Sequence, residues 1–426
     1  MSELAYAPLE SFADVIMGQS PGADLCNTED KGLPFLQGSA EFGTRNPKAT
    51  IYCAPPLRIA KVGSILTSVR APVGTLNYAD QDYCIGRGLG SFKAKNGISN
   101  TIFLKHAVEL NAAYLHRRSQ GSTFSAVSTD DVRSIPIPVF EVAKQEKLAT
   151  IFIGIDTAVE RTEALIDKYL QLKTGLMQDM FTRGVLPNGQ LRPPRSEASE
   201  LYQKTAIGWI PKDWSIKKTA EVLDSIADGP FGSNLKTEHY VIDPGVRVVR
   251  LQNVAEYQYN DGDRAYVSSR HAAYLVRNKV VGGDVLIAGL GEERYPVGRA
   301  CTYPSNLPPA INKADCFRAR CILDVMHNKF FMLFLNSELA RQQIRRYEQG
   351  VTRPRINTGN LKRLLVGVPS LHEQVSIIKK IEAAQTTIRT QQMRVENLKA
   401  QKLGLMQDLL TGKVPVKVDE PDAGDA

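Results

Sequence analysis

The sequence predicts an α+β protein with two tandem heads of mixed α/β structure, separated by an antiparallel two-helix coiled coil and related by a pseudo-twofold. Two observations support this fold class. The pentapeptide GLMQD at residues 175–179 returns unchanged at residues 404–408. In both places it closes a long helical pattern that follows a β-rich region. Two large copies, in contrast to many short ones, are typical of a two-headed protein and not of a solenoid.

The offset that brings position 175 to position 404 also aligns the chain upstream of these helices. QGST at 120–123 meets QGVT at 349–352, and Thr129 meets Thr358. A register of this length indicates a tandem duplication. Within the heads the agreement falls to short matches, such as GSIL at 63–66 with GDVL at 283–286. The two copies agree at the borders of the heads and differ inside them. This pattern favours two heads of the same fold that bind different targets.

The heads are predicted at residues 1–140 and 206–370. In both, short β-rich runs alternate with Gly, Pro and Asn turns, and a helical stretch follows. The β-rich runs include 64–67, 246–251 and 284–287, and the helical stretches are 101–118 and 329–346.

Two further segments contain no predicted helix or strand. Residues 186–205 are polar and contain prolines, which predicts a linker between the halves. Residues 415–426 form an acidic tail that we expect to be disordered.

Long spacer helices are predicted at residues 141–185 and 371–414. Glycine is rare in both, and one residue of every three or four falls on a single stripe, as in a coiled-coil seam. These seam residues are Phe152, Ile155, Val159, Thr162, Ile166, Tyr169, Lys173, Leu176 and Met180 in the first helix, and Ile381, Ala384, Ile388, Gln391, Val395, Leu398, Lys402, Leu405 and Leu409 in the second.

Polar residues interrupt both seams at equivalent places, Thr162 with Gln391 and Lys173 with Lys402. Polar seam positions cost stability but specify register and partner, so we expect the two helices to pair with each other. The alternative is two amphipathic helices that each pack on their own head. From residue 152 to 180 a paired rod spans about 42 Å at about 1.5 Å per residue. That length is comparable to the roughly 34–36 Å between half-sites one DNA turn apart.

Composition indicates a globular protein with a preference for anions. The chain has 426 residues, 43% of them apolar, a net charge of +8 and a pI near 9.0. Residues 206–370 hold 23 Lys and Arg against 16 Asp and Glu, so the second head carries much of the basic excess. The six cysteines show no C-x-x-C pair, which favours reduced thiols. No signal peptide or membrane span is expected, so the predicted location is the cytoplasm.

Arginines gather where the repeat is best kept. Arg117 and Arg118 precede QGST, and Arg345 and Arg346 precede QGVT. A helix that ends in arginines and continues into a Gly-Ser/Thr turn offers guanidinium, hydroxyl and backbone N–H donors, which suit phosphate oxygens. The alternative is that these arginines favour the negative end of their own helix.

Other basic and amide side chains lie in turn-rich segments, where Arg, Asn and Gln can read base edges bidentately. For any one of them, solvated surface is an equally good interpretation. The complete set of candidate DNA-binding residues is Arg70, Arg87, Arg117, Arg118, Thr123, Asn234, Lys236, Arg250, Gln252, Asn253, Arg294, Arg299, Arg345, Arg346, Arg353 and Arg355.

The sequence shows no catalytic or metal-binding pattern. There is no Gly-Lys-Ser/Thr phosphate loop, and the glycine-rich GRGLG at 86–90 runs into a predicted strand instead of a helix. The Pro-Pro pairs at 55–56 and 308–309 do not follow the Asn or Asp that an adenine methyltransferase motif requires. The six histidines occur singly, without ligand spacing, so no metal is expected.

The order of the motifs resembles that of the specificity subunit of type I restriction-modification systems. GWIP at 208–211 and DGPFGSNLK at 228–236 begin the second head. In each copy the Gly-Ser/Val-Thr turn precedes a proline-bearing run, IPIP at 135–138 or VGVP at 366–369. Gln145 and Gln374 then begin the helices that GLMQD closes. The resemblance covers residues 1 to about 415, although the first head lacks a GWIP-like segment.

The resemblance implies two target recognition domains, each reading one half of a split, asymmetric site in double-stranded DNA, with the paired helices setting the gap. It also implies two docked methyltransferase (M) subunits, with restriction (R) subunits joining afterwards. S-adenosylmethionine, ATP and Mg would then be used by those partners. This chain itself would bind no cofactor and catalyse no reaction.

Two other hypotheses remain open at this point. The chain can be a self-contained restriction or modification enzyme whose catalytic motifs are unrecognised, which predicts turnover by the chain alone. It can also be a coiled-coil scaffold with a fortuitously basic surface, which predicts no sequence preference for DNA.

Overall fold

The structure is a computed structural model that describes residues 4–119, 126–242, 245–292 and 294–417. Its contacts divide the chain into two compact units. The first unit is formed by residues 1–165 with 391–426, and the second by residues 166–390.

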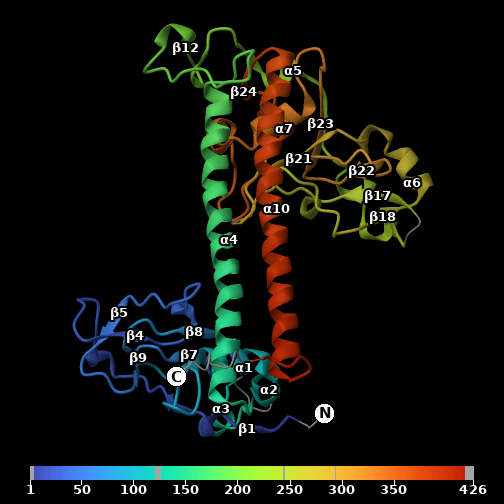
Figure 1. Cartoon of the computed structure of the whole chain (residues 1–426). Coiled ribbons are helices and arrows are strands. Elements are labelled where there is room, and N and C mark those ends of the chain that lie inside the picture. The colour runs from blue at the N-terminus through green and yellow to red at the C-terminus, as the bar shows by residue number, and fades with distance from the viewer. Residues whose placement is uncertain (1–3, 120–125, 243–244, 293, 418–426) are drawn as a thin grey trace. The chain divides into compact units, whose positions relative to one another are not determined.

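Both units contain a sheet-rich head and a part of each long helix, α4 (Val142–Thr182) and α10 (Leu371–Leu410) (Figure 1). The unit boundary therefore falls inside the two helices, whereas the sequence suggested separate head and helix segments. Strands and short helices alternate in both heads, which confirms the predicted mixed α/β fold class.

The first head contains three sheets. One has the strand order β2-β10-β7-β8, one has the order β3-β5-β4-β9-β6 with β4 parallel to β9, and one is the pair β1-β11. All four residues of β7 are buried, as expected of a central strand covered on both faces. The strands are β1 (Tyr6–Pro8), β2 (Ala13–Met17), β3 (Cys26–Asn27), β4 (Leu33–Leu36), β5 (Ile51–Cys53), β6 (Ile59–Ala60), β7 (Ile65–Ser68), β8 (Leu76–Tyr78), β9 (Tyr83–Ile85), β10 (Leu89–Ala94) and β11 (Pro136–Pro138).

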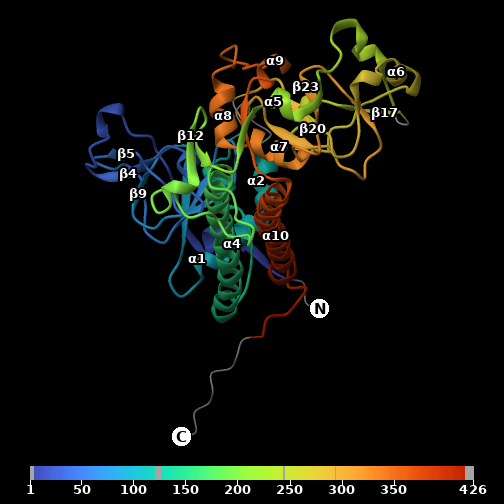
Figure 2. The same ribbon diagram turned by 90° about the horizontal axis from the view of Figure 1, so that it is seen from above.

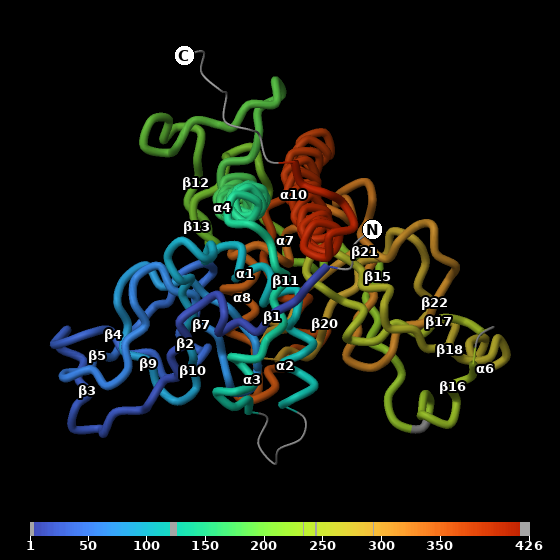
Figure 3. The backbone as a smooth tube through the Cα atoms, turned by 60° about the horizontal axis from the view of Figure 1, so that its bottom comes forward, coloured from blue at the N-terminus to red at the C-terminus, as the bar shows by residue number. Residues whose placement is uncertain are grey.

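The second head repeats these sheets in the same order. They are β15-β23-β20-β21, then β16-β18-β17-β22-β19 with β17 parallel to β22, and the pair β14-β24. Strands β17 and β22 lie side by side in Figure 3. A further pair, β12-β13, belongs to the second unit. The strands are β12 (Tyr202–Thr205), β13 (Gly208–Pro211), β14 (Ser215–Lys218), β15 (Leu223–Ala227), β16 (Tyr240–Val241), β17 (Val246–Val249), β18 (Tyr266–Val267), β19 (Lys279–Val280), β20 (Val285–Ala288), β21 (Ala300–Thr302), β22 (Ala310–Asn312), β23 (Cys316–Cys321) and β24 (Leu365–Val368).

The helical stretch predicted in each head is broken into two helices. In the first head the break lies at Asn111, whose Nδ2 donates to the carbonyls of Ala107 and Pro136. In the second head it lies at Asn336, after which Ser337 caps the next helix. The helices are α1 (Thr101–Leu110), α2 (Ala112–Ser119) and α3 (Thr129–Arg133) in the first head, and α5 (Thr219–Val222), α6 (Ser269–Tyr274), α7 (Asn328–Leu335), α8 (Glu338–Arg345) and α9 (Thr358–Leu361) in the second. Helix α7 packs against β20, β21 and β23 (Figure 2).

The changing offset between equivalent strands explains why the repeat fades inside the heads. The equivalent strands β2 and β15 begin at residues 13 and 223. Strands β7 and β20 begin at residues 65 and 285, and strands β11 and β24 begin at residues 136 and 365. The offset therefore grows along the head. A comparison at the constant offset that fits the long helices loses register here, although the strand order is kept.

The two long helices run antiparallel within each unit. In the first unit Phe152 of α4 shares a hydrophobic core with Met406 and Leu409 of α10. In the second unit Met180 of α4 shares a core with Ile377 and Ile381 of α10. The start of one helix thus meets the end of the other. All eighteen predicted seam residues are buried or half-buried.

The segment predicted as a linker, residues 186–205, packs on the second unit. Arg192 is buried, and its guanidinium donates to both carboxylate oxygens of Glu373, at 2.5 and 3.1 Å. Glu373 also accepts from the indole N–H of Trp214 at 3.2 Å and from the backbone N–H of Val185 at 2.8 Å. The end of the segment forms β12, which pairs with β13. These contacts hold the segment against the start of α10.

None of the helices in the described part of the chain is long and apolar enough to cross a bilayer.

Candidate nucleic-acid interface

A groove of about 810 Å³ opens on the second head. One wall is the loop that follows β17, from Leu251 to Asp261, and the other is the turn that contains Leu290 and Tyr295. Arg353 joins them from a third segment. Three of the candidate residues, Gln252, Arg299 and Arg353, are brought together here from distant parts of the sequence.

Arg299 holds the two walls of the groove together. Its side chain is buried, and it donates to the carbonyls of Val254 at 2.7 Å, Leu251 at 3.2 Å and Leu290 at 3.1 Å. Donors that are used by backbone carbonyls are not free for a base. The expectation that Arg299 reads DNA directly is therefore replaced by a positioning role beneath the groove.

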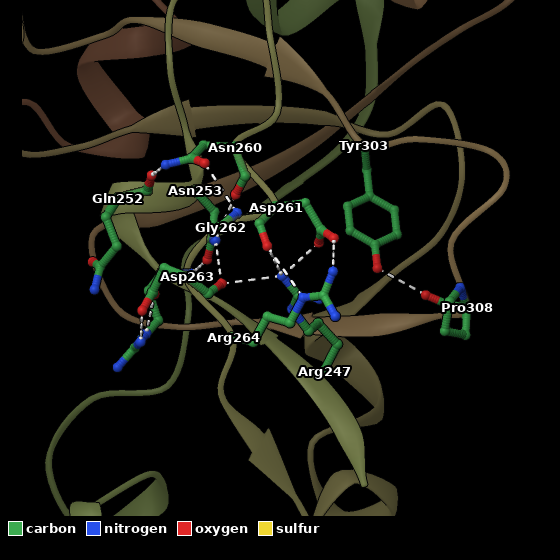
Figure 4. Close-up of polar contacts among 11 residues, drawn as sticks. Arg247, Gln252, Asn253, Asn260, Asp261, Gly262, Asp263, Arg264, Tyr303 and Pro308 are labelled. Carbon is green, nitrogen blue, oxygen red and sulfur yellow. Dashed lines mark hydrogen bonds and ion pairs between the residues drawn. The ribbon is translucent and has the colours of Figure 1, made fainter. Parts of the chain in front are cut away.

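Asn253 has a similar internal role (Figure 4). The residue is completely buried, its Nδ2 donates to the carbonyls of Asn260 and Asp263 at 2.8 Å each, and its Oδ1 accepts from the N–H of Arg250 at 2.8 Å. The Arg250 guanidinium pairs with the carboxylate of Asp263, with Nε donating at 2.7 Å. Asn253 therefore shapes the loop and does not face a partner, and the charge of Arg250 is balanced inside the loop.

The exposed side chains of the groove favour base edges over phosphates. Gln252 and Arg353 are exposed, and Tyr295 is 54% exposed. The acidic residues Glu256, Asp261 and Glu292 line the same groove, so its charge is not that of a phosphate channel. Arg and Gln can donate to purine edges, and carboxylates can accept from the cytosine amino group.

The arginines predicted to contact phosphate lie elsewhere in the second head. Arg345 ends α8, Arg346 follows it, and both are exposed. Arg345 pairs with Glu338 at 3.1 Å, a surface ion pair of little energetic consequence. Four other candidates are exposed: Asn234, Lys236 (3.7 Å from Glu238), Arg294, and Arg355 (3.5 Å from Asp315).

Four candidates of the first head are exposed as well. Arg70 forms a backbone bridge with Ala126, and Arg87 lies in the turn before β10. Arg117 and Arg118 are in the last turn of α2. Arg118 lies over the ring of Tyr114 and pairs with Asp131 at 2.9 Å, so it is partly neutralised. Thr123 lies outside the described residues.

Sequence reasoning missed the partners of the two polar seam lysines. The ammonium of Lys402 lies 2.9 Å from Glu109 of the first head and 2.9 Å from Asp156 of α4. His106, which is completely buried, lies 3.2 Å from Glu109. Burial alone would raise the pKa of Glu109, but the hydrogen bond with His106 and the charge of Lys402 hold this pKa at about 2. The seam pattern marked Lys402 as unusual without indicating its partner.

Lys173, the repeat equivalent of Lys402, contacts the second head. Its ammonium lies 3.7 Å from the ring centroid of Tyr257, a cation–π contact. Tyr257 has a φ of 65°, a left-handed conformation that is rare for an aromatic residue. Burial lowers the pKa of Lys173, and the carboxylate of Glu256 partly offsets this effect. Each lysine therefore links its helix to the head of its own unit.

The sequence comparisons identify the family. The family model described as the type I restriction modification DNA specificity domain matches residues 1–168 and 293–400. The chain belongs to this family.

Members of the specificity-domain family from Methanocaldococcus jannaschii are similar over different lengths. The putative type I restriction enzyme MjaX specificity subunit is 36% identical over 173 residues, which is 41% of this chain and 41% of that protein. The chain thus spans about two fifths of that relative. The type I restriction enzyme MjaVIII specificity subunit is 23% identical over 336 residues, 76% of this chain and 72% of that protein.

Solved structures of the specificity-subunit family share the fold. A crystal structure of the S subunit of a type I restriction-modification system from M. genitalium aligns with a TM-score of 0.57 at 13% identity, over 96% of this chain and 97% of that one. A structure from work on the assembly and conformational transition of the type I R-M system also gives 0.57, at 14% identity, over 97% and 99%. At these identities the similarity concerns the fold.

Proposed function

We propose that this chain is the DNA specificity subunit of a type I restriction-modification complex, and that each head binds one half of a split, asymmetric site. The observation that carries the proposal is the repeated sheet order in two heads whose sequences between the strands differ. Two copies of one scaffold with different loops suit a target with two different halves. The family match to residues 1–168 and 293–400 supports the same conclusion.

In this proposal the long helices set the gap between the half-sites. Helices α4 and α10 contain 41 and 40 residues, and each unit includes a part of both. A helix of this length spans about 60 Å at about 1.5 Å per residue, which is enough to bridge more than one DNA turn. The lysines at 173 and 402 would hold each head in a defined orientation on the helices.

The chemistry is assigned to partner subunits. We infer that two methyltransferase subunits dock on this chain, that restriction subunits join them, and that S-adenosylmethionine, ATP and Mg are used there. The groove on the second head supports recognition: its arginine and amide donors suit base edges, and the motifs of methyl transfer and phosphate binding are absent from the sequence.

The test is to map methylated positions after co-expression with the partner methyltransferase subunit. The proposal expects methylation at one split sequence with a constant gap. Methylation at a single unsplit sequence would contradict the two-headed model. Methyl transfer or cleavage by the purified chain alone, with S-adenosylmethionine and a divalent metal, would instead support a self-contained enzyme.

A further inference from the structure

Residues 349–355 form a short hairpin on the second head. Gln349 and Arg355 close it with two backbone hydrogen bonds, of 3.0 and 2.9 Å. Gly350 has a φ of 91°, a conformation that favours glycine, and Pro354 restricts the returning arm. The backbone is thus constrained at both ends of the hairpin.

The hairpin is attached directly to the end of the central strand β20. Gly291 donates its N–H to the carbonyl of Pro354 at 2.8 Å, and Ile356 donates to the carbonyl of Gly289 at 3.0 Å. A Cβ at position 289 would lie 2.4 Å from the ring of Phe317, so the close approach requires glycine. These contacts form a platform for the hairpin, so the sheet sets the position at which the hairpin is attached.

The first unit has an equivalent platform. Val127 donates to the carbonyl of Val69 at 3.0 Å, and Ala126 bridges with Arg70, as Ile356 does with Gly289 and Arg355 with Leu290. Ala126 and Val127 are the repeat equivalents of Arg355 and Ile356. The attachment is therefore kept in both heads, while the sequence that precedes it differs, QGSTFS at 120–125 and QGVTRP at 349–354.

Val351 occupies the tip of the hairpin with an exposed fraction of 101%. An apolar side chain in this position contributes nothing to the core of the free protein. Arg353, two residues later, lines the groove together with Gln252. The hairpin therefore carries both an exposed isopropyl group and, two residues later, an arginine that lines the groove.

We propose that Val351 contacts the 5-methyl group of a thymine in the half-site bound by the second head. This inference rests on the proposed DNA-recognition function. The thymine methyl is the apolar group that base pairs present in the major groove, and small apolar side chains recognise it by contact. The valine side chain has no donor for a phosphate. In this proposal Val351 is a specificity-determining residue, and Arg353 of the same hairpin provides a polar group in the groove.

The experiment measures DNA binding by the complete complex with the methyltransferase subunit, on the site defined by methylation mapping. Each thymine of both half-sites, on both strands, is replaced singly by deoxyuridine, which lacks only the 5-methyl group. For the wild type, one replacement in one half-site should weaken binding roughly four-fold, the change expected for burial of one methyl group. Val351→Ala, which shortens the apolar side chain, should reduce that discrimination and leave the other half-site unaffected. Leu323→Ala is the matched control. Leu323 is also exposed, but it follows the C-terminal end of β23, which is the end of the strand away from the hairpin.

The outcomes distinguish a failure of the proposed function from a failure of the assignment of Val351. If no sequence-specific binding occurs, the proposed function itself fails. If binding is specific but no thymine-to-deoxyuridine replacement in either half-site depends on Val351, only the assignment of Val351 is overturned. A uniform loss of affinity for all DNA in Val351→Ala also contradicts it, because that result indicates a sequence-independent contact. Since Val351 is fully exposed, the substitution leaves the fold intact.

Discussion

Gln145 and Gln374, which occupy equivalent places in the repeat, make the same three hydrogen bonds in the two units. The amide nitrogen of Gln145 donates to the carbonyls of Phe140 at 2.8 Å and Ile98 at 3.4 Å, and its oxygen accepts from the N–H of Asn100 at 3.0 Å.

For Gln374 the partners are Pro369 at 3.0 Å, Val325 at 2.9 Å and His327 at 2.8 Å. Asn100 and His327 are the N-caps of α1 and α7. Each glutamine therefore joins the start of a long helix to the N-terminus of a helix in its head, α1 or α7.

Replacing Gln374 by Leu should destabilise the second unit by about 3 kcal/mol. The side chain is completely buried, and its loss leaves an N–H group and two carbonyls without partners. Urea unfolding, followed by a probe in that unit, measures the effect. Gln392→Leu, at an exposed position of α10, should change the free energy of unfolding by less than about 0.5 kcal/mol. Equal midpoints for the two variants would refute the structural role of Gln374.

Replacing Lys402 by Met should destabilise the first unit by about 2 kcal/mol, because two carboxylates lose their common cation. The Lys402 side chain is 15% exposed, and Glu109 and Asp156 are both 2.9 Å away. Lys399 provides a control one turn earlier, since it pairs with Glu163 at 2.8 Å but is 52% exposed. Lys399→Met should cost less than about 0.5 kcal/mol in thermal unfolding.

The Glu109 cluster should make the first unit sensitive to acid. The pKa of Glu109 is about 2 in the folded state, below its ordinary value of 4.5. Its carboxylate therefore stabilises the fold fully above pH 4.5, and this contribution is lost as pH falls from 4.5 through about 2. The difference in unfolding temperature between wild type and Glu109→Gln should be constant above about pH 5.5 and should shrink below pH 4. A difference that grows on acidification has the wrong sign for this assignment.

Replacing Arg345 and Arg346 by Ala should weaken binding of specific and non-specific DNA about equally. Both side chains are exposed, and phosphate contacts carry no sequence information. The slope of log K against log salt should decrease by about two, roughly one for each lost phosphate contact. Lys204→Ala, at an exposed position of β12, serves as the control and should leave the slope unchanged. A double variant with an unaltered salt slope would rule out phosphate contacts for this pair.

Inserting seven residues into both α4 and α10, at equivalent points, should lengthen the gap between half-sites and keep their sequences. Seven residues add about 10 Å of helix, or about three base pairs. Insertion into one helix alone is the control, and it should abolish specific binding because the helices lose register. Methylation mapping provides the measurement. Altered half-site sequences in the double insertion would exclude a pure spacer role.

The sequence predicted the large features of the fold because they follow from periodic patterns. The long helices and the mixed heads are present, and Gln145 and Gln374 begin equivalent helices. The predicted seam residues are buried or half-buried in the structure. The common strand order of the heads was not predicted, because insertions in loops change the offset between equivalent strands along the head and hide the match.

Residue chemistry alone identified the candidate site less well. Asn253 and Arg299 are of the residue types that read bases, yet their donors are used by backbone carbonyls inside the second head. Their neighbours Gln252 and Arg294 are exposed, and nothing in residue type distinguishes these cases. The sequence did not predict a role for Val351, because its exposure on a hairpin is seen only in the folded chain.

The core shared by Phe152, Met406 and Leu409 has a consequence for biosynthesis. The first unit includes residues 391–426, whereas the second unit is complete by residue 390. All residues of the second unit therefore leave the ribosome before the last residues of the first unit are available for folding. During that interval the apolar face of the first head is uncovered, and premature release of the nascent chain would leave it so.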